Sequence, residues 1–159
     1  MADTSQSHSQ VVVDRRGRAP ISHPSARFAF GTLLLFTLLT AAVTYPQAWR
    51  LSDGLNDFGD PLLNTWALAW VAHQLPRAPL HLFDGNIFYP ARDTLAFSEP
   101  LIVPALMGAP LHWLGASPVL VFNLVLLLGF ALTAWAGYVV AYEWTGDRTA
   151  GMLAGSMFA

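Results

Sequence analysis

Hydrophobic residues dominate two long stretches of the chain, 28–49 and 100–142, and the second contains no Asp, Glu, Lys or Arg. About 20 apolar residues in a helix cross the roughly 30 Å hydrocarbon core of a bilayer. Because both stretches reach this length, the pattern predicts an all-α polytopic membrane protein. Its expected membrane domain covers 28–159, with transmembrane helices at 28–48 and 118–142 and the start of a third at 149–159.

The segment 61–75 predicts a helix that lies on the membrane surface. Asp60 is a preferred N-cap residue, Pro61 suits the first helical position, and Pro76 stops the apolar run. With about fifteen residues the helix is shorter than a normal span. Trp66 suits the headgroup layer. An interfacial helix is therefore favoured over a short transmembrane one.

The rest of the loop at 49–117 predicts further surface structure. Residues 76–99 contain several prolines and aromatic residues and are typical of an irregular, structured loop. Prolines and a glycine interrupt the apolar run that follows, so 101–114 predicts a second interfacial or half-inserted helix.

The N-terminal segment 1–27 is polar and basic. It is too poor in apolar residues to offset the entropy of ordering, so we expect a disordered tail. A signal peptide is the alternative, but 28–49 is too long for its apolar region. By the positive-inside rule, the four arginines place the tail in the cytoplasm and the loop 49–117 outside. In a bacterium, this predicts an inner-membrane protein whose first loop is periplasmic.

Composition supports the membrane assignment. Hydrophobic residues make up 54% of the chain, charged residues 11%, and lysine is absent. Ordinary soluble domains are about 25% charged, so this chain has too little polar surface to cover a soluble fold. The absence of cysteine excludes disulfides and thiolate zinc sites. An apolar segment reaches Ala159, from which we expect the sequence to be the N-terminal part of a longer protein.

Acidic residues gather in the predicted external loop, which makes it the expected functional region. Six of the ten acids of the chain lie there: Asp53, Asp57, Asp60, Asp84, Asp93 and Glu99. Carboxylates can orient or deprotonate an attacking hydroxyl or amine. Simpler interpretations remain open: Asp60 as a helix cap, Asp57 as a solvated loop acid, and Glu99 as a charge at a helix N-terminus.

The loop also carries a motif that resembles a known enzyme family. DPLLN at 60–64 resembles the Asp-Pro-hydrophobic-hydrophobic-Asn motif in the first external loop of oligosaccharyltransferase catalytic subunits. FYP at 88–90, TLA at 94–96 and PALM at 104–107 are similar to later stretches of that family. The layout is similar to the wider GT-C class of polytopic glycosyltransferases.

The resemblance implies a sugar transferase that uses a polyprenyl-phosphate-linked donor. Asp60 would bind the acceptor, in some members through a divalent metal such as Mg²⁺ or Mn²⁺, and Asp57 and Glu99 are further candidate acids. Asn64, within the motif, is a candidate substrate-binding residue. Arg92 is another, because its planar guanidinium matches phosphate oxygens, although such an arginine also suits lipid headgroups.

Two other functional classes stay open. A transporter or lipid flippase would carry ionisable groups inside its spans, and the predicted spans carry none. A non-catalytic membrane protein would tolerate neutralisation of its loop acids. The sequence has no glycine-rich nucleotide loop and no basic surface for nucleic acid. The expected partners are the lipid bilayer and the lipid-linked sugar.

Overall fold

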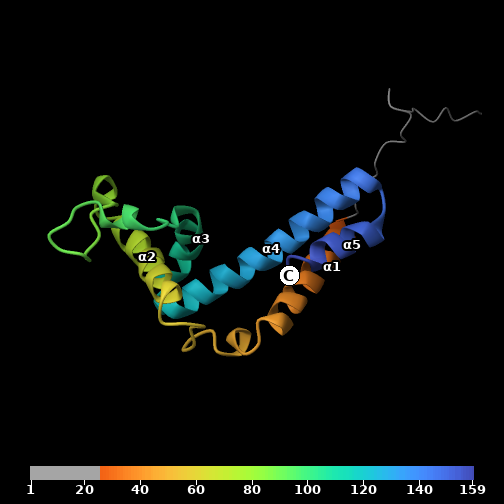
Figure 1. Ribbon diagram of the computed structural model, residues 1–159, viewed down its shortest axis with the longest axis horizontal. Helices are drawn as coiled ribbons and strands as arrows, with labels where there is room; N and C mark the ends of the chain where they lie inside the picture. The colour runs from red at the N-terminus through yellow and green to blue at the C-terminus, as the bar shows by residue number, and fades with distance from the viewer. Residues whose placement is uncertain (1–25) are drawn as a thin grey trace, which may run out of the picture.

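The computed structural model describes residues 26–159, so the predicted tail at 1–27 lies almost wholly outside the described residues. Within this range the regular structure is helical, which confirms the all-α fold class (Figure 1). The α-helices are α1 (Ala26–Val43), α2 (Asp60–Gln74), α3 (Ile102–Trp113), α4 (Pro118–Thr145) and α5 (Arg148–Ser156). Short 3₁₀ helices cover Gln47–Trp49, Pro79–His81 and Thr94–Phe97.

The longest helix, α4, connects two groups of helices. In Figure 1, α2 and α3 lie beside its N-terminal part, and α1 and α5 lie beside its C-terminal part. Each group has its own hydrophobic core. The first core contains Ala67, Leu68, Val71, Leu95, Ala105, Val121, Phe122 and Val125. The second contains Phe36, Ala134, Tyr138 and Tyr142.

Among the described residues, α4 alone is long and apolar enough to cross a membrane, with a mean hydropathy of 2.3 in its best window. Only 28% of that window is buried, so most of the helix is not covered by the other described residues. Ser117 caps the helix by accepting a hydrogen bond from the Leu120 N–H, and Gly146 ends it with φ +72°. The helix predicted at 118–142 is therefore present, three residues longer than expected.

The first predicted span is shorter than expected. We predicted 28–48, but α1 ends at Val43 after 18 residues, and the chain turns into a 3₁₀ helix at Gln47. Pro46 explains the early end, since proline lacks an N–H and disfavours helical geometry at the preceding residue. The helix is apolar but does not by itself meet the length of a membrane span.

Close packing joins α5 to the second core through two glycines. An added Cβ at Gly151 would meet the ring of Tyr138, and one at Gly155 would meet the ring of Phe36. Small residues let helices approach closely, so the Gly-x-x-x-Gly pair has a packing role here.

Buried amides attach the segment after α1 to α4. Asn123 is fully buried, and its side-chain oxygen accepts a 2.7 Å hydrogen bond from Gln47 Nε2. Its own amide donates to the carbonyls of Leu51 and Gly54, at 2.9 and 2.8 Å. Asn56 then donates to Gln47 at 2.6 Å. This network holds 47–56 in place and so positions the start of α2.

Candidate functional site

The loop 82–99 folds back onto α2 through two tryptophan side chains. Trp70 Nε1 donates to the Leu82 carbonyl at 2.8 Å, and Trp66 Nε1 donates to Asn86 Oδ1 at 3.0 Å. The expected membrane-facing Trp66 therefore has a protein partner for its indole N–H. The helix expected at 61–75 is confirmed as α2, and the irregular loop expected at 76–99 is confirmed as well.

Contacts between 83–85 and 94–95 close this loop. Leu95 N–H donates to the Phe83 carbonyl at 3.1 Å, and Thr94 Oγ1 donates to the Gly85 carbonyl at 3.1 Å. An added Cβ at Gly85 would lie 2.6 Å from Thr94 Oγ1 and 2.9 Å from Trp66 Cη2. Only glycine permits this close approach of the loop to α2.

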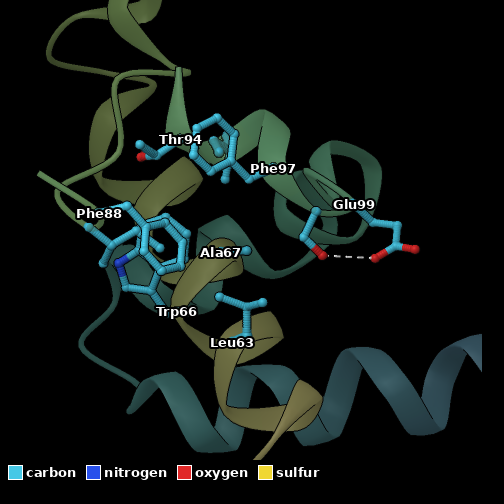
Figure 2. A pocket seen from close by; sticks show the side chains of 10 residues that line it. Leu63, Trp66, Ala67, Phe88, Thr94, Phe97 and Glu99 are labelled. Atoms are coloured by element: carbon cyan, nitrogen blue, oxygen red, sulfur yellow. Dashed lines mark hydrogen bonds between the residues drawn. The ribbon is translucent and has the colours of Figure 1, made fainter. Parts of the chain in front are cut away.

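A pocket of about 300 Å³ lies between α2 and this loop. Figure 2 shows Leu63, Trp66 and Ala67 of α2 with Phe88, Phe97 and Glu99 of the loop around it. The rings of Phe88 and Phe97 are stacked, with centroids 6.0 Å apart. The pocket is largely apolar and aromatic, and the Glu99 carboxylate lies at its edge.

Glu99 is exposed and held in its ionised form. Its carboxylate accepts a hydrogen bond from its own backbone N–H and a 3.0 Å bond from Ser98 Oγ, drawn as a dashed line in Figure 2. Both bonds favour the charged carboxylate and lower the pKa of Glu99. Since α3 begins only at Ile102 and has no acid in its first turn, Glu99 is not a first-turn helix charge.

Backbone strain gathers along the same loop and at the start of α3. Phe88, Asp93 and Leu101 have positive φ angles of 59°, 55° and 45°. For bulky residues such as Phe88 and Leu101 this conformation is rare and costs about 1–3 kcal/mol each. Phe88 lines the pocket and Asp93 directly precedes the 3₁₀ helix that carries Thr94. Strain of this kind is typical of binding and catalytic segments.

The candidate acids Asp57 and Asp60 lie outside this pocket, both exposed, at the N-terminal end of α2. Asp57 Oδ1 accepts hydrogen bonds from the N–H groups of Phe58 and Gly59, at 2.6 and 3.4 Å. The prediction that Asp60 is the N-cap is wrong by one residue. Gly59 is the cap and Asp60 is the first helical residue, with no side-chain capping bond.

This shift leaves the Asp60 carboxylate free for a ligand. The upstream turn is already closed by Asp57, so Asp60 is not needed to satisfy it. As an acid in the first turn, Asp60 still gains from the positive end of the helix dipole. Leu63, one turn later on the same helix, lines the pocket that Glu99 borders.

Asn64 lies one helical turn after Asp60 on α2, and Arg92 lies in the loop after that helix. Asn64 lines a second pocket, of about 330 Å³, whose other walls are mostly apolar residues of α3 and α4 such as Pro104 and Phe130. Arg92 is exposed in the loop, where its charge helps to lower the pKa of Asp84, although the main cause is the hydrogen bond from His81. The second helix expected at 101–114 is confirmed as α3.

No group of three or more His, Cys, Asp or Glu side chains converges among residues 26–159. Magnesium is commonly held by one or two carboxylates together with substrate phosphates. Asp57 and Asp60 are two exposed carboxylates near the start of α2.

Sequence reasoning missed the aromatic walls of the Glu99 pocket. Phe88 and Phe97 are far from α2 in sequence, and only the fold places them over Trp66 and Leu63. The clustering of Gly85 with FYP at 88–90 was the available signal for a tight loop. No known protein family, curated protein or solved structure matches the chain.

Proposed function

We propose that the chain is part of an integral membrane glycosyltransferase of the GT-C type that uses a polyprenyl-phosphate-linked sugar. The supporting observation is the Glu99 pocket, in which an ionised carboxylate borders an aromatic cavity beside α2. Sugars bind well against aromatic rings, and acids at the rim can hold their hydroxyl groups. Asp60 lies at the start of α2, the same helix that forms one wall of this pocket.

In this proposal Asp60 is the acid that binds the acceptor. Its exposed carboxylate accepts the proton of the acceptor hydroxyl or amine, whose oxygen or nitrogen attacks the anomeric carbon of the donor sugar. The bond from that carbon to the phosphate breaks, and polyprenyl phosphate leaves. Glu99 binds the sugar in the pocket, and Asp57 supports Asp60.

Asn64 and Arg92 have substrate-binding roles in the same proposal. Arg92 pairs with the carrier phosphate, and Asn64 is the polar group in a pocket lined mainly by apolar residues of α3 and α4. A divalent ion, Mg²⁺ or Mn²⁺, would be held by Asp60 and Asp57 and would neutralise phosphate charge when bound.

The proposed topology places the reaction on the outer side of the bacterial inner membrane. α4 is a span, α1 with its flanking residues is another, and α2 and α3 lie along the membrane surface. The exposed apolar side chains of α1, including Phe30 and Leu38, support contact with lipid.

Sugar transfer from labelled polyprenyl-phosphate sugars tests the function. Membranes from cells that produce the full-length protein are incubated with a panel of such donors carrying ¹⁴C-labelled hexoses or pentoses. We expect label to move from the carrier lipid to an acceptor fraction, and membranes without the protein serve as the control. Equal transfer in both membranes across the panel would refute the proposal.

A further inference from the structure

A polar pocket of about 560 Å³, separate from the Glu99 and Asn64 pockets, lies where α2 and α3 end. Its lining residues are His73, Pro76, Arg77, His112 and Trp113. The site is at the other end of α2 from Asp60, so it is separate from the proposed catalytic region. Sequence spacing could not reveal it, because α2 and α3 contribute residues that are distant in the chain.

Two side-chain bonds bring these residues together. Trp113 Nε1 donates to the Ala72 carbonyl at 2.8 Å, which joins the end of α3 to the end of α2. Arg77 Nη1 donates to the His73 carbonyl at 2.9 Å, which holds the guanidinium beside the pocket. The free carbonyls at a helix C-terminus carry partial negative charge and normally repel an anion. Here two of them are already occupied by these donors.

The polar groups that line the pocket are donors or basic side chains. Arg77 is permanently charged and has five N–H donors, of which the bond to His73 uses one. His112 Nδ1 is buried and has no hydrogen-bond partner among the described residues. No carboxylate lines the pocket. Asp84, on the loop that Gln74 contacts, is bonded to His81 at 2.9 Å.

We propose that this pocket binds a phosphate group, either on a lipid headgroup or free in solution. A guanidinium provides a planar pair of donors for phosphate oxygens, and the two imidazoles of His73 and His112 add further donors. A metal ion is disfavoured, because only two imidazoles are present and the charge of Arg77 would repel it.

Histidine NMR on the full-length protein in detergent micelles tests the proposal. The ¹H–¹³C imidazole signals are assigned with single His→Asn variants, and inorganic phosphate or dihexanoyl phosphatidic acid is added in separate titrations. We expect the signals of His73 and His112 to shift with saturation. His81, which is bonded to Asp84, is the internal control, and its signal should not shift with ligand concentration as the signals of His73 and His112 do.

Two arginine variants complete the experiment. Arg77→Gln should weaken binding about tenfold or more, the loss that removal of one charge-assisted hydrogen bond produces. Arg50→Gln is the matched control, since Arg50 is an exposed arginine paired with Asp53 away from the pocket, and it should bind normally. If Arg77→Gln fails to fold, His112→Asn takes its place, and it should likewise bind phosphate about tenfold or more weakly than Arg50→Gln does.

The two ligand titrations identify the source of the phosphate. Tighter binding of the phosphatidic acid supports a lipid headgroup, and equal binding supports a free phosphate. The absence of saturable shifts with both ligands would overturn the proposal. So would equal affinity in Arg77→Gln and Arg50→Gln.

Discussion

Asn123 of α4 and Gln47 of the 3₁₀ helix after α1 share a buried hydrogen bond of 2.7 Å. Their exposed fractions are 0% and 4%, so water cannot replace the bond if one partner is lost. The contact joins residues that are distant in sequence and holds the segment after α1, from which the acid-bearing loop continues, against α4. The position of Asp57 and Asp60 therefore depends on a residue inside the candidate membrane helix.

Asn123→Ala should destabilise the protein by about 1–3 kcal/mol, because it leaves the Gln47 Nε2 group and the carbonyls of Leu51 and Gly54 without their side-chain partner. The measurement is the free energy of unfolding in detergent micelles. Thr133→Ala, on the exposed face of the same helix, removes only a bond to its own helix at Gly129 and should cost far less. Similar losses in both variants would contradict the anchoring role.

Gly85→Ala should open the loop over the Glu99 pocket. The added Cβ would overlap Thr94 Oγ1 and the ring of Trp66, and overpacking of this kind costs about 1–3 kcal/mol. Hydrogen exchange of the Leu95 amide, which bonds to Phe83, reports the opening. Gly31→Ala is the control, since nothing lies within 4 Å of its added Cβ. Unchanged exchange in Gly85→Ala would contradict the packing account.

The pKa of Glu99 should lie below its usual value, because its own backbone N–H and the Ser98 hydroxyl both donate to the carboxylate. Since folding lowers this pKa, the stabilisation is present above the unfolded-state pKa and is lost as the pH falls through the lower folded-state pKa. Glu99 therefore stays ionised throughout the neutral range.

Carboxyl ¹³C NMR checks this expectation, and Glu143, the other glutamate of the chain, provides an internal reference. Ser98→Ala removes one donor and should raise the pKa of Glu99 toward its usual value. A Glu99 pKa that does not change in Ser98→Ala would show that the hydroxyl has no part in the shift.

The topology predicts that 50–100 lies on one side of the membrane, opposite the N-terminus. Because the chain has no cysteine, Ser52→Cys and Ser98→Cys each introduce a unique thiol. An impermeant thiol reagent added to intact cells should label both variants. Labelling of Ser52→Cys alone would mean that α2 crosses the membrane and divides the loop.

The sequence allowed the helices to be located but not the sites that they form. Asp60, Pro61 and Pro76 carry local signals, so α2 was predicted within one residue at each end. The cap was misplaced because Asp57, outside the predicted helix, bonds the turn before it. The length of α1 was overestimated because apolar residues continue past Val43. The helix ends at Val43 because Pro46 follows three residues later.

The pockets could not be predicted because they depend on contacts between distant segments. The sequence predicted that Trp66 lies in the lipid headgroup layer, yet its indole N–H donates a hydrogen bond to Asn86 in the loop. His73 and His112 lack any regular spacing and meet only because α2 and α3 pack side by side. Hydrophobic periodicity determines which face of a helix is buried, but it does not identify the partner of that face.

Sugar transfer by three acid variants of the full-length protein tests the central claim most directly. Asp60→Asn and Glu99→Gln keep side-chain size but remove the charge, and both should lower the transfer rate. Asp60→Asn should lower it by about a hundredfold or more, as expected for loss of an acid–base group, and Glu99→Gln because the carboxylate that binds the sugar is lost. Asp93→Asn is the control, because asparagine tolerates the positive φ of that position, and it should transfer sugar at the wild-type rate. Wild-type rates in both Asp60→Asn and Glu99→Gln, at normal protein abundance, would contradict the account.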